Sequence, residues 1–126
     1  MKIERLDHLV LTVKDLESSS HFYQRVLGMS IVTFGEGRIA LSFGNQKINL
    51  HEYGQEFEPK AQTPLPGSAD LCFISLSSMD EIIQHLQQHE VEILEGPVKR
   101  TGANGAIMSV YFRDPDQNLI EVSNQL

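Results

Sequence analysis

Four side chains have the types that bind divalent metal ions and lie in stretches that are otherwise rich in apolar, β-branched residues. His8 and His51 belong to the first half of the chain, and Asp70 and Glu121 belong to the second half. A buried polar group without a partner costs roughly 1–3 kcal/mol, so each of these side chains needs a partner. Two imidazoles and one or two carboxylates that meet at one point suit Fe(II), Mn(II), Ni(II), Co(II) or Zn(II).

Simpler explanations exist for each of these residues. A histidine on a strand is more often a satisfied core or surface residue than a metal ligand. Glu121 lies between Ile120 and Val122, where an ionised carboxylate needs a cation or several hydrogen-bond donors. Asn49 is two residues before His51 and shares its strand face, so either side chain could occupy that position of the site. Imidazole is the better ligand for these metals, which favours His51.

The elements that must position these side chains occur twice in the same order. In the first half, the patterns predict a strand, a helix and three strands at residues 6–13, 16–27, 30–34, 38–43 and 47–52. In the second half they predict the same order at residues 69–75, 79–89, 98–101, 107–113 and 119–123. The strand 6–13 is expected to be buried on both faces. The sequence therefore predicts an α+β fold of two β-α-β-β-β modules, at about residues 1–53 and 69–126, joined by a proline-rich linker at about 54–68.

Length and composition limit the function. The chain has 126 residues, 40% of them apolar, which suits a single domain at residues 1–126. A net charge of −7 without a basic cluster argues against nucleic acid and anionic membranes as partners. The single cysteine, Cys72, cannot form an internal disulfide and is expected to be a small buried group. Without a signal peptide or a long apolar stretch, a cytoplasmic location is expected.

Three motifs resemble the vicinal oxygen chelate superfamily, which includes glyoxalase I, the fosfomycin- and bleomycin-resistance proteins and the extradiol dioxygenases. The motifs are Leu6-Asp7-His8-Leu9-Val10-Leu11, Phe22-Tyr23 with Leu27-Gly28-Met29, and Asp114-Pro115-Asp116-Gln117-Asn118-Leu119-Ile120-Glu121. The segments 47–52, 57–61 and 96–102 look most like the glyoxalase domain-containing protein 5 group.

The resemblance implies a curved mixed sheet around one divalent metal ion, with open positions for two adjacent substrate oxygens. It implies that His8, His51, Asp70 and Glu121 are the metal ligands, although Asp70 stands where the superfamily usually has histidine. Asn49 is the alternative to His51. The resemblance also implies a homodimer and a small-molecule substrate.

Two residues are expected to act in the chemistry. A bound metal ion polarises a substrate carbonyl, and Glu121 or Asp70 could act as a general base beside it if its bond to the ion loosens. Tyr111 lies ten residues before Glu121, as does a substrate-contacting tyrosine of the fosfomycin-resistance proteins. Together with Ser109 and Arg113 on its strand face, Tyr111 could orient a substrate. The alternative is a row of polar side chains that faces the surface.

The positions at which this chain differs from each of these enzymes help to choose between their reactions. Thr12 replaces the glutathione-contacting arginine of glyoxalase I, and no arginine follows Arg113 to bind a phosphonate. His8, His51 and Glu121 could supply the triad of an extradiol dioxygenase, but no further pocket histidine is evident. The first hypothesis is a glyoxalase-like, metal-dependent lyase or isomerase that acts on a small oxygenated molecule. A metal-free small-molecule binding or resistance protein is the second hypothesis, and an extradiol-type dioxygenase is the third.

Overall fold

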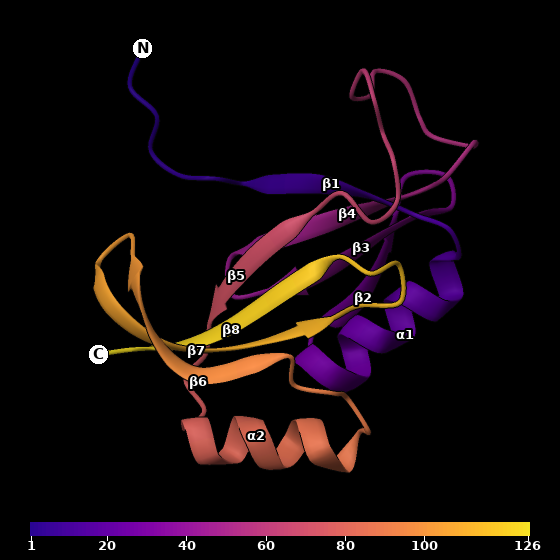
Figure 1. The fold of residues 1–126 in the computed structure, drawn as a ribbon. Helices are drawn as coiled ribbons and strands as arrows, with labels where there is room; N and C mark the ends of the chain where they lie inside the picture. The colour runs from indigo at the N-terminus through magenta and orange to yellow at the C-terminus, as the bar shows by residue number, and fades with distance from the viewer. The chain divides into compact units, whose positions relative to one another are not determined.

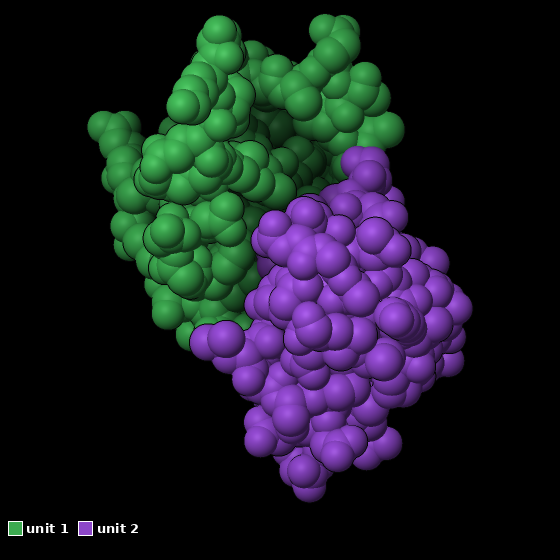
Figure 2. Space-filling view, turned by 90° about the vertical axis from the view of Figure 1, so that its left-hand side faces the viewer, with its two compact units in different colours: residues 1–66 green, residues 67–126 purple.

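The computed structural model describes residues 1–126, which fall into two compact units. Unit 1 spans Met1–Pro66 and unit 2 spans Gly67–Leu126, as the two colours of Figure 2 show. Each unit contains one four-stranded mixed sheet and one helix in the order β-α-β-β-β, so the predicted fold class is confirmed. Neither helix is both long enough and apolar enough to span a bilayer.

Unit 1 is built from one helix and the strands β1 to β4 (Figure 1). Its elements are β1 (His8–Val13), α1 (Leu16–Leu27), β2 (Ser30–Phe34), β3 (Arg38–Phe43) and β4 (Gln46–Glu52). Helix α1 begins where the Asp15 carboxylate accepts a hydrogen bond from the Ser18 backbone N–H at 2.9 Å. It ends at Gly28, whose φ of 68° belongs to the left-handed region that glycine adopts without strain.

The sheet of unit 1 has the strand order β1-β4-β3-β2 and one apolar face. Helix α1 packs against β2, β3 and β4. On β4, Ile48 and Leu50 are buried in the core with Leu41 and Tyr23. Because side chains alternate along a strand, Asn49 and His51 point to the face opposite α1.

Unit 2 repeats this arrangement with different turns. Its elements are β5 (Asp70–Ile74), α2 (Met79–Gln88), β6 (Glu95–Gly102), β7 (Gly105–Arg113) and β8 (Leu119–Gln125), in the sheet order β5-β8-β7-β6. Val110, Phe112 and Ile120 on β7 and β8 are fully buried. Strand β5 pairs with β8 in parallel, in a register that places Cys72 beside Glu121. Strand β7 pairs with β8 in the opposite direction and places Tyr111 on the other side of Glu121.

The turn between β7 and β8 is held together by buried polar side chains. Asp114 Oδ1 accepts hydrogen bonds from the backbone N–H groups of Asp116 and Asn118, both at 2.9 Å. Its Oδ2 accepts one from Asn118 Nδ2 at 2.8 Å, and Asn118 Oδ1 accepts one from the backbone N–H of Ala69. The turn therefore fixes the start of β8 and ties it to the segment that enters β5.

Two local expectations were wrong. Strand β1 begins at His8 and is not buried on both faces, because it is an edge strand and His8 and Val10 are exposed. Strand β6 begins at Glu95, three residues before the predicted start. Gly96 and Pro97 resemble a turn in the sequence, whereas the structure keeps them in the strand as an irregularity in the pairing with β7.

Candidate functional site

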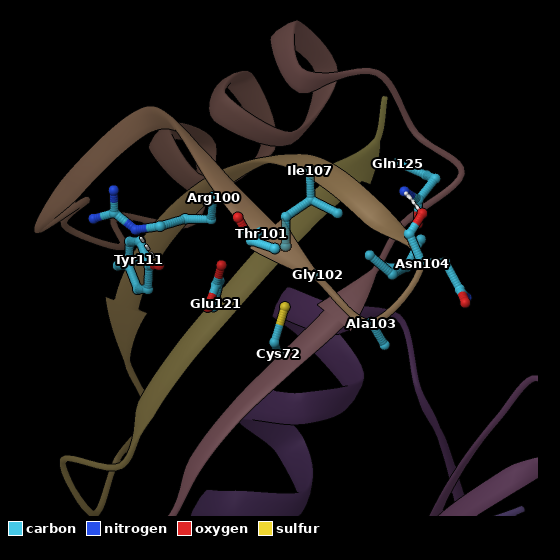
Figure 3. A pocket seen from close by; sticks show the side chains of 11 residues that line it. Cys72, Arg100, Thr101, Gly102, Ala103, Asn104, Ile107, Tyr111, Glu121 and Gln125 are labelled. Atoms are coloured by element: carbon cyan, nitrogen blue, oxygen red, sulfur yellow. Dashed lines mark hydrogen bonds between the residues drawn. The ribbon is translucent and has the colours of Figure 1, made fainter.

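Unit 2 contains a cavity of about 360 Å³ on the face of its sheet that carries Cys72, Tyr111 and Glu121 (Figure 3). This volume lies at the lower end of the range of small-molecule pockets. The hairpin between β6 and β7 forms part of the wall. The cavity is lined by Cys72, Ile74, Arg100, Thr101, Gly102, Ala103, Asn104, Ile107, Tyr111, Glu121 and Gln125.

Two neighbouring hydroxyl groups hold the Glu121 carboxylate. Ser109 Oγ donates to Glu121 Oε2 at 2.6 Å, and Ser123 Oγ lies 3.5 Å from the same oxygen. The two serine hydroxyls are 2.7 Å apart, and both serines are fully buried. No ion pair of the structure includes Glu121. The carboxylate is therefore oriented by its own sheet without a cation that neutralises it.

The hydroxyl group of Tyr111 is held beside this carboxylate. Arg100 Nε donates a hydrogen bond to Tyr111 Oη at 3.0 Å (Figure 3), and Arg100 Nη2 donates to Glu95 Oε1 at 3.1 Å. A guanidinium group can only donate, so Tyr111 must accept this bond and its own proton points elsewhere. Burial raises the pKa of Tyr111 above its ordinary value; the hydrogen bond from Arg100 opposes this, and interaction with the Glu121 carboxylate adds to it. Tyr111 is therefore a protonated donor at neutral pH.

The sequence predicted that Cys72 is a small buried residue, and this prediction was wrong. The residue is exposed, lines the cavity and has its Sγ 3.5 Å from Ser123 Oγ. Partial burial of the thiol group raises its pKa, so the thiol is protonated at neutral pH. Its position beside Glu121 follows from the parallel register of β5 and β8, which the sequence does not reveal.

In unit 1, His8 is paired with its neighbour in the sequence. His8 Nδ1 and Asp7 Oδ2 are 2.8 Å apart, and this contact is the first cause of the lowered pKa of Asp7. Histidines that bind metals usually donate their second ring N–H to a carboxylate, which leaves the other nitrogen for the ion. Asp7 therefore fixes the orientation of the His8 ring. The contact leaves Nε2 of His8 available.

Asn49 and His51 are buried polar side chains with an unmet hydrogen-bonding atom. Asn49 is 5% exposed and His51 is 3% exposed. Asn49 Oδ1 and His51 Nε2 are buried and have no hydrogen-bond partner. Such groups each cost about 1–3 kcal/mol and are uncommon in folded proteins, so they call for a bound molecule or water as partner.

The charges around His51 differ from those around Glu121. Burial is the largest cause that lowers the pKa of His51, and the positive charge of Arg38 lowers it further. Glu56 acts in the opposite direction, and Lys60 acts with Arg38. Lys60 is itself paired with Glu56 and Glu58, so Arg38 is the positive charge near His51 that no carboxylate balances.

The predicted metal ligands are divided between the two units, His8 and His51 in unit 1 and Asp70 and Glu121 in unit 2. In unit 1, the register pairs His8 with Lys47, so Asn49 is two residues further along β4 and His51 is four. Four residues correspond to about 13 Å along a strand, so Asn49 is the nearer neighbour of His8. In unit 2, Asp70 lies on the same face as Glu121 but is exposed and does not line the cavity. Convergence of all four residues on one ion stays a prediction.

Several residues of the site were missed by the sequence analysis. Arg100 was overlooked because its contact with Tyr111 depends on the register of β6 against β7, which the sequence does not reveal. Arg113, which the sequence grouped with Tyr111, donates to the Gln117 carbonyl at 3.3 Å and does not line the cavity. Nothing in the sequence pointed to Arg38, because only the pairing of β3 with β4 brings it near His51.

Comparison with known proteins identifies the class to which the fold and the site belong. Residues 5–122 match the Glyoxalase/Bleomycin resistance protein/Dioxygenase superfamily, and the chain belongs to this superfamily. The predicted superfamily is thereby confirmed.

Individual relatives cover nearly the whole chain. Virulence protein STM3117 of Salmonella typhimurium is 58% identical over 123 residues, which are 98% of this chain and 85% of that protein. Glyoxalase domain-containing protein RDO1 of Mycosarcoma maydis is 57% identical over 124 residues, which are 98% of this chain and 70% of that protein. An integron cassette protein from the mobile metagenome of V. cholerae has a structure with a TM-score of 0.98 and 62% identity, covering 100% of this chain and 98% of that one. Their names specify no reaction.

Divalent metals are common in the superfamily, and two of the residues fit such an ion. The imidazole of His8 has one nitrogen fixed by Asp7 and one nitrogen available. The carboxylate of Glu121 is oriented by hydroxyl groups and carries no neutralising cation. Nitrogen and oxygen donors of this kind suit Zn(II), Ni(II), Mn(II), Fe(II) and Co(II).

Proposed function

We propose that this chain is a glyoxalase-like lyase or isomerase that moves a proton on a small oxygenated molecule bound in the unit 2 cavity. Glu121 accepts the proton from carbon, and Tyr111 donates a hydrogen bond to the substrate oxygen. The observation that carries the proposal is the fixed arrangement of a carboxylate and a protonated phenol on the wall of one 360 Å³ cavity.

Each partner of these two residues has a consequence for proton transfer. Ser109 and Ser123 hold Glu121 Oε2, so the carboxylate is oriented before the substrate enters. Arg100 occupies one side of the Tyr111 hydroxyl as a donor, so the Tyr111 proton faces away from Arg100, where the Glu121 carboxylate or a substrate oxygen can accept it. A substrate oxygen that gains negative charge when carbon loses its proton is such an acceptor.

A divalent metal ion would complete this arrangement. His8 and Glu121 would hold it, together with Asp70 and with Asn49 or His51 as further ligands. When bound, the metal supplies Lewis-acid stabilisation of the negative charge on the substrate oxygen. Glu121, Tyr111 and the serines perform the binding, orientation and proton transfer described above.

Proton transfer is tested by exchange with solvent. The full chain, loaded separately with Zn(II), Ni(II), Mn(II), Fe(II) or Co(II), is incubated in D₂O with hydroxyacetone, dihydroxyacetone, glyceraldehyde or pyruvate. Deuterium incorporation at the carbon beside the carbonyl is followed by NMR. The expected result is exchange above the protein-free rate with at least one compound. Glu121→Gln should abolish it, and Tyr111→Phe should slow it about 10²–10⁴-fold.

Metal content gives a second, independent measurement. Protein purified without added metal should contain one divalent ion per chain, and His8→Ala and Glu121→Ala should lose it. His21→Ala, a change at an exposed position of α1, should keep it. Exchange equal in wild type and Glu121→Gln would refute the assignment of Glu121.

A metal-free binding protein is the second candidate function. The polar groups of the cavity are paired with one another, as the Glu95–Arg100–Tyr111 chain of hydrogen bonds illustrates, so the cavity is shaped before any ligand enters. A protein that contains no metal, catalyses no exchange and binds a small molecule in this cavity would support the second candidate. The extradiol reaction receives no separate support from these contacts.

A further inference from the structure

Helix α2 carries two histidines that the proposed proton transfer does not use (Figure 1). His85 lies in the last turn of the helix, and His89 is the residue at its C-terminal cap. Both histidines are half-buried, whereas the neighbouring side chains of Gln84, Gln87 and Gln88 are exposed. Residues four positions apart lie on the same side of a helix. The two imidazole rings therefore occupy one place, at the margin of the buried face of α2.

The two rings are already close together. Their centres are 4.3 Å apart and their planes are inclined by 58°. A metal ion with bonds of about 2.0–2.1 Å to two imidazole nitrogens holds these nitrogens about 3 Å apart. Rings at the observed separation can bring one nitrogen each to this spacing by rotation about side-chain bonds. No change of the backbone is needed.

The backbone holds both histidines at helical spacing up to the end of α2. The His89 N–H donates to the His85 carbonyl at 3.1 Å, as in the body of a helix. The chain then turns at Glu90, which has a φ of 56°, and the Val91 N–H donates to the Leu86 carbonyl at 2.9 Å. Because these bonds fix the helix end, a ligand that binds both rings has little backbone freedom to remove.

The charges along this part of the chain favour a cation. The sequence has no lysine or arginine between Lys60 and Lys99. Asp80 and Glu81 lie in the first turn of α2, and Glu81 is one turn before His85. The C-terminal end of a helix also carries a partial negative charge, which stabilises cations near it. Imidazole is a ligand that transition metals prefer, so the cation that fits is a metal ion of this kind.

We propose that His85 and His89 chelate a divalent transition-metal ion, Cu(II), Ni(II) or Zn(II), that joins the last turn of α2 to its cap. No third histidine, cysteine or carboxylate belongs to a three-residue metal site with the pair, so water fills the remaining positions and the ion exchanges with solvent. Cu(II) binds most tightly, because the affinity of nitrogen sites rises to Cu(II) and falls again at Zn(II). The site shares no residue with the proposed proton-transfer site or its metal ligands.

The test is a titration of the metal-free full chain with Cu(II) at neutral pH, followed by NMR of the assigned histidine ring protons. Paramagnetic Cu(II) broadens the signals of the rings that bind it. Among the five histidines, the signals of His85 and His89 should broaden together and before that of His21, an exposed histidine of α1. Broadening of His21 at the same Cu(II) concentration would overturn the proposal, because it would show binding to any exposed imidazole.

Two diamagnetic ions separate imidazole ligation from attraction to the acidic surroundings. Zn(II) should shift the ring signals of both His85 and His89. Mg(II), which prefers oxygen ligands, should leave both signals unshifted. Equal shifts with Mg(II) and Zn(II), or no shift with Zn(II), would overturn the proposal.

Variants test whether the two rings act as a chelate. His85→Gln and His89→Gln should each bind one Cu(II) fewer per chain than wild type in equilibrium dialysis, and His21→Gln should bind as wild type does. This difference holds whether or not an ion also binds at His8 and Glu121. Wild-type uptake by both His85→Gln and His89→Gln would contradict the proposal.

A control for spacing keeps the number of imidazoles constant. The double change Gln87→His with His89→Gln places the two rings two positions apart, on different sides of α2. It should weaken Cu(II) binding at least about tenfold relative to wild type. Circular dichroism verifies that the helix is retained. Unchanged affinity in this folded double variant would overturn the proposed chelate.

Discussion

Strands β4 and β8 occupy equivalent places in the two units, but the polar side chains of β8 have hydrogen-bond partners and those of β4 lack them. Each is the last strand of its unit and pairs in parallel with the first strand. On β8, Glu121 accepts a hydrogen bond from Ser109 and approaches a second hydroxyl on Ser123. On β4, Asn49 Oδ1 and His51 Nε2 are buried without partners.

The difference shows that one topology can prepare a site in two ways. In unit 2, serine hydroxyls of the same sheet bind the Glu121 carboxylate, so this group is oriented before it exchanges a proton. In unit 1, Asn49 Oδ1 and His51 Nε2 have no partner within the protein, so they gain their missing hydrogen bonds only from a bound molecule or water. The hydrogen-bonded polar groups of β7 and β8 should therefore contribute to folding stability, whereas the unpartnered ones of β4 should oppose it.

The turns that lead into β8 and β4 should show the largest contrast. Asp114→Ala removes three buried hydrogen bonds before β8 and should lower the free energy of unfolding by about 3 kcal/mol. Asn45→Ala, in the exposed turn before β4, should change it by less than about 0.5 kcal/mol. Urea denaturation of both variants measures the difference. Equal losses would show that the buried network does not stabilise unit 2.

Substitutions of polar residues on the strands themselves should change the free energy of unfolding differently in the two units. Ser109→Ala removes the hydroxyl that bridges Glu121 and Ser123, and should cost about 1–3 kcal/mol of unfolding free energy. Asn49→Leu removes an unpartnered group and should be neutral or stabilising. Both values come from the same denaturation experiment without ligand. Destabilisation of Asn49→Leu to the same extent as Ser109→Ala would abolish the contrast.

At alkaline pH the comparison concerns Tyr111. Its folded-state pKa is raised above the ordinary value of 10.0, so its contribution to stability is complete below pH 10.0 and is lost as pH rises through the folded-state pKa. Wild-type protein should therefore lose more stability above pH 10.0 than Tyr111→Phe does. Tyr53→Phe, at an exposed tyrosine of unit 1, should behave like wild type. Denaturation at pH 8 and pH 10.5 measures this, and ultraviolet titration of the phenols should show a late ionisation that only Tyr111→Phe removes.

At acid pH the comparison of the two units concerns His51. Its effect on stability should be the smallest of the four effects predicted here. Its folded-state pKa is lowered from 6.5 by burial and then by Arg38, so its contribution to stability is present above pH 6.5 and is lost as pH falls through the folded-state pKa. His51→Leu should therefore lose less stability between pH 7.5 and pH 5.5 than wild type. His21→Leu should retain the wild-type pH dependence. A wild-type pH dependence in His51→Leu would show that acid destabilisation arises elsewhere.

The local elements could be predicted from the sequence because their signals lie within a few residues. Helix α1 has its predicted bounds, which follow from the Asp15 cap and the left-handed Gly28. Strands β2 and β3 also have their predicted bounds, since short glycine-containing turns separate antiparallel neighbours. The repeated order of elements and the motif around Glu121 were enough to place the chain in its superfamily.

The sequence by itself thus determined the order of elements, the repeated module and the importance of Glu121 and Tyr111 as residues to test. Only the tertiary structure decided which groups accompany them: Arg100 beside Tyr111, Asp7 on His8, and Arg38 opposite His51. The physical reason is that caps and turns depend on neighbours in the sequence. Partners across a sheet depend on strand register, and a shift of one residue turns every side chain to the other face.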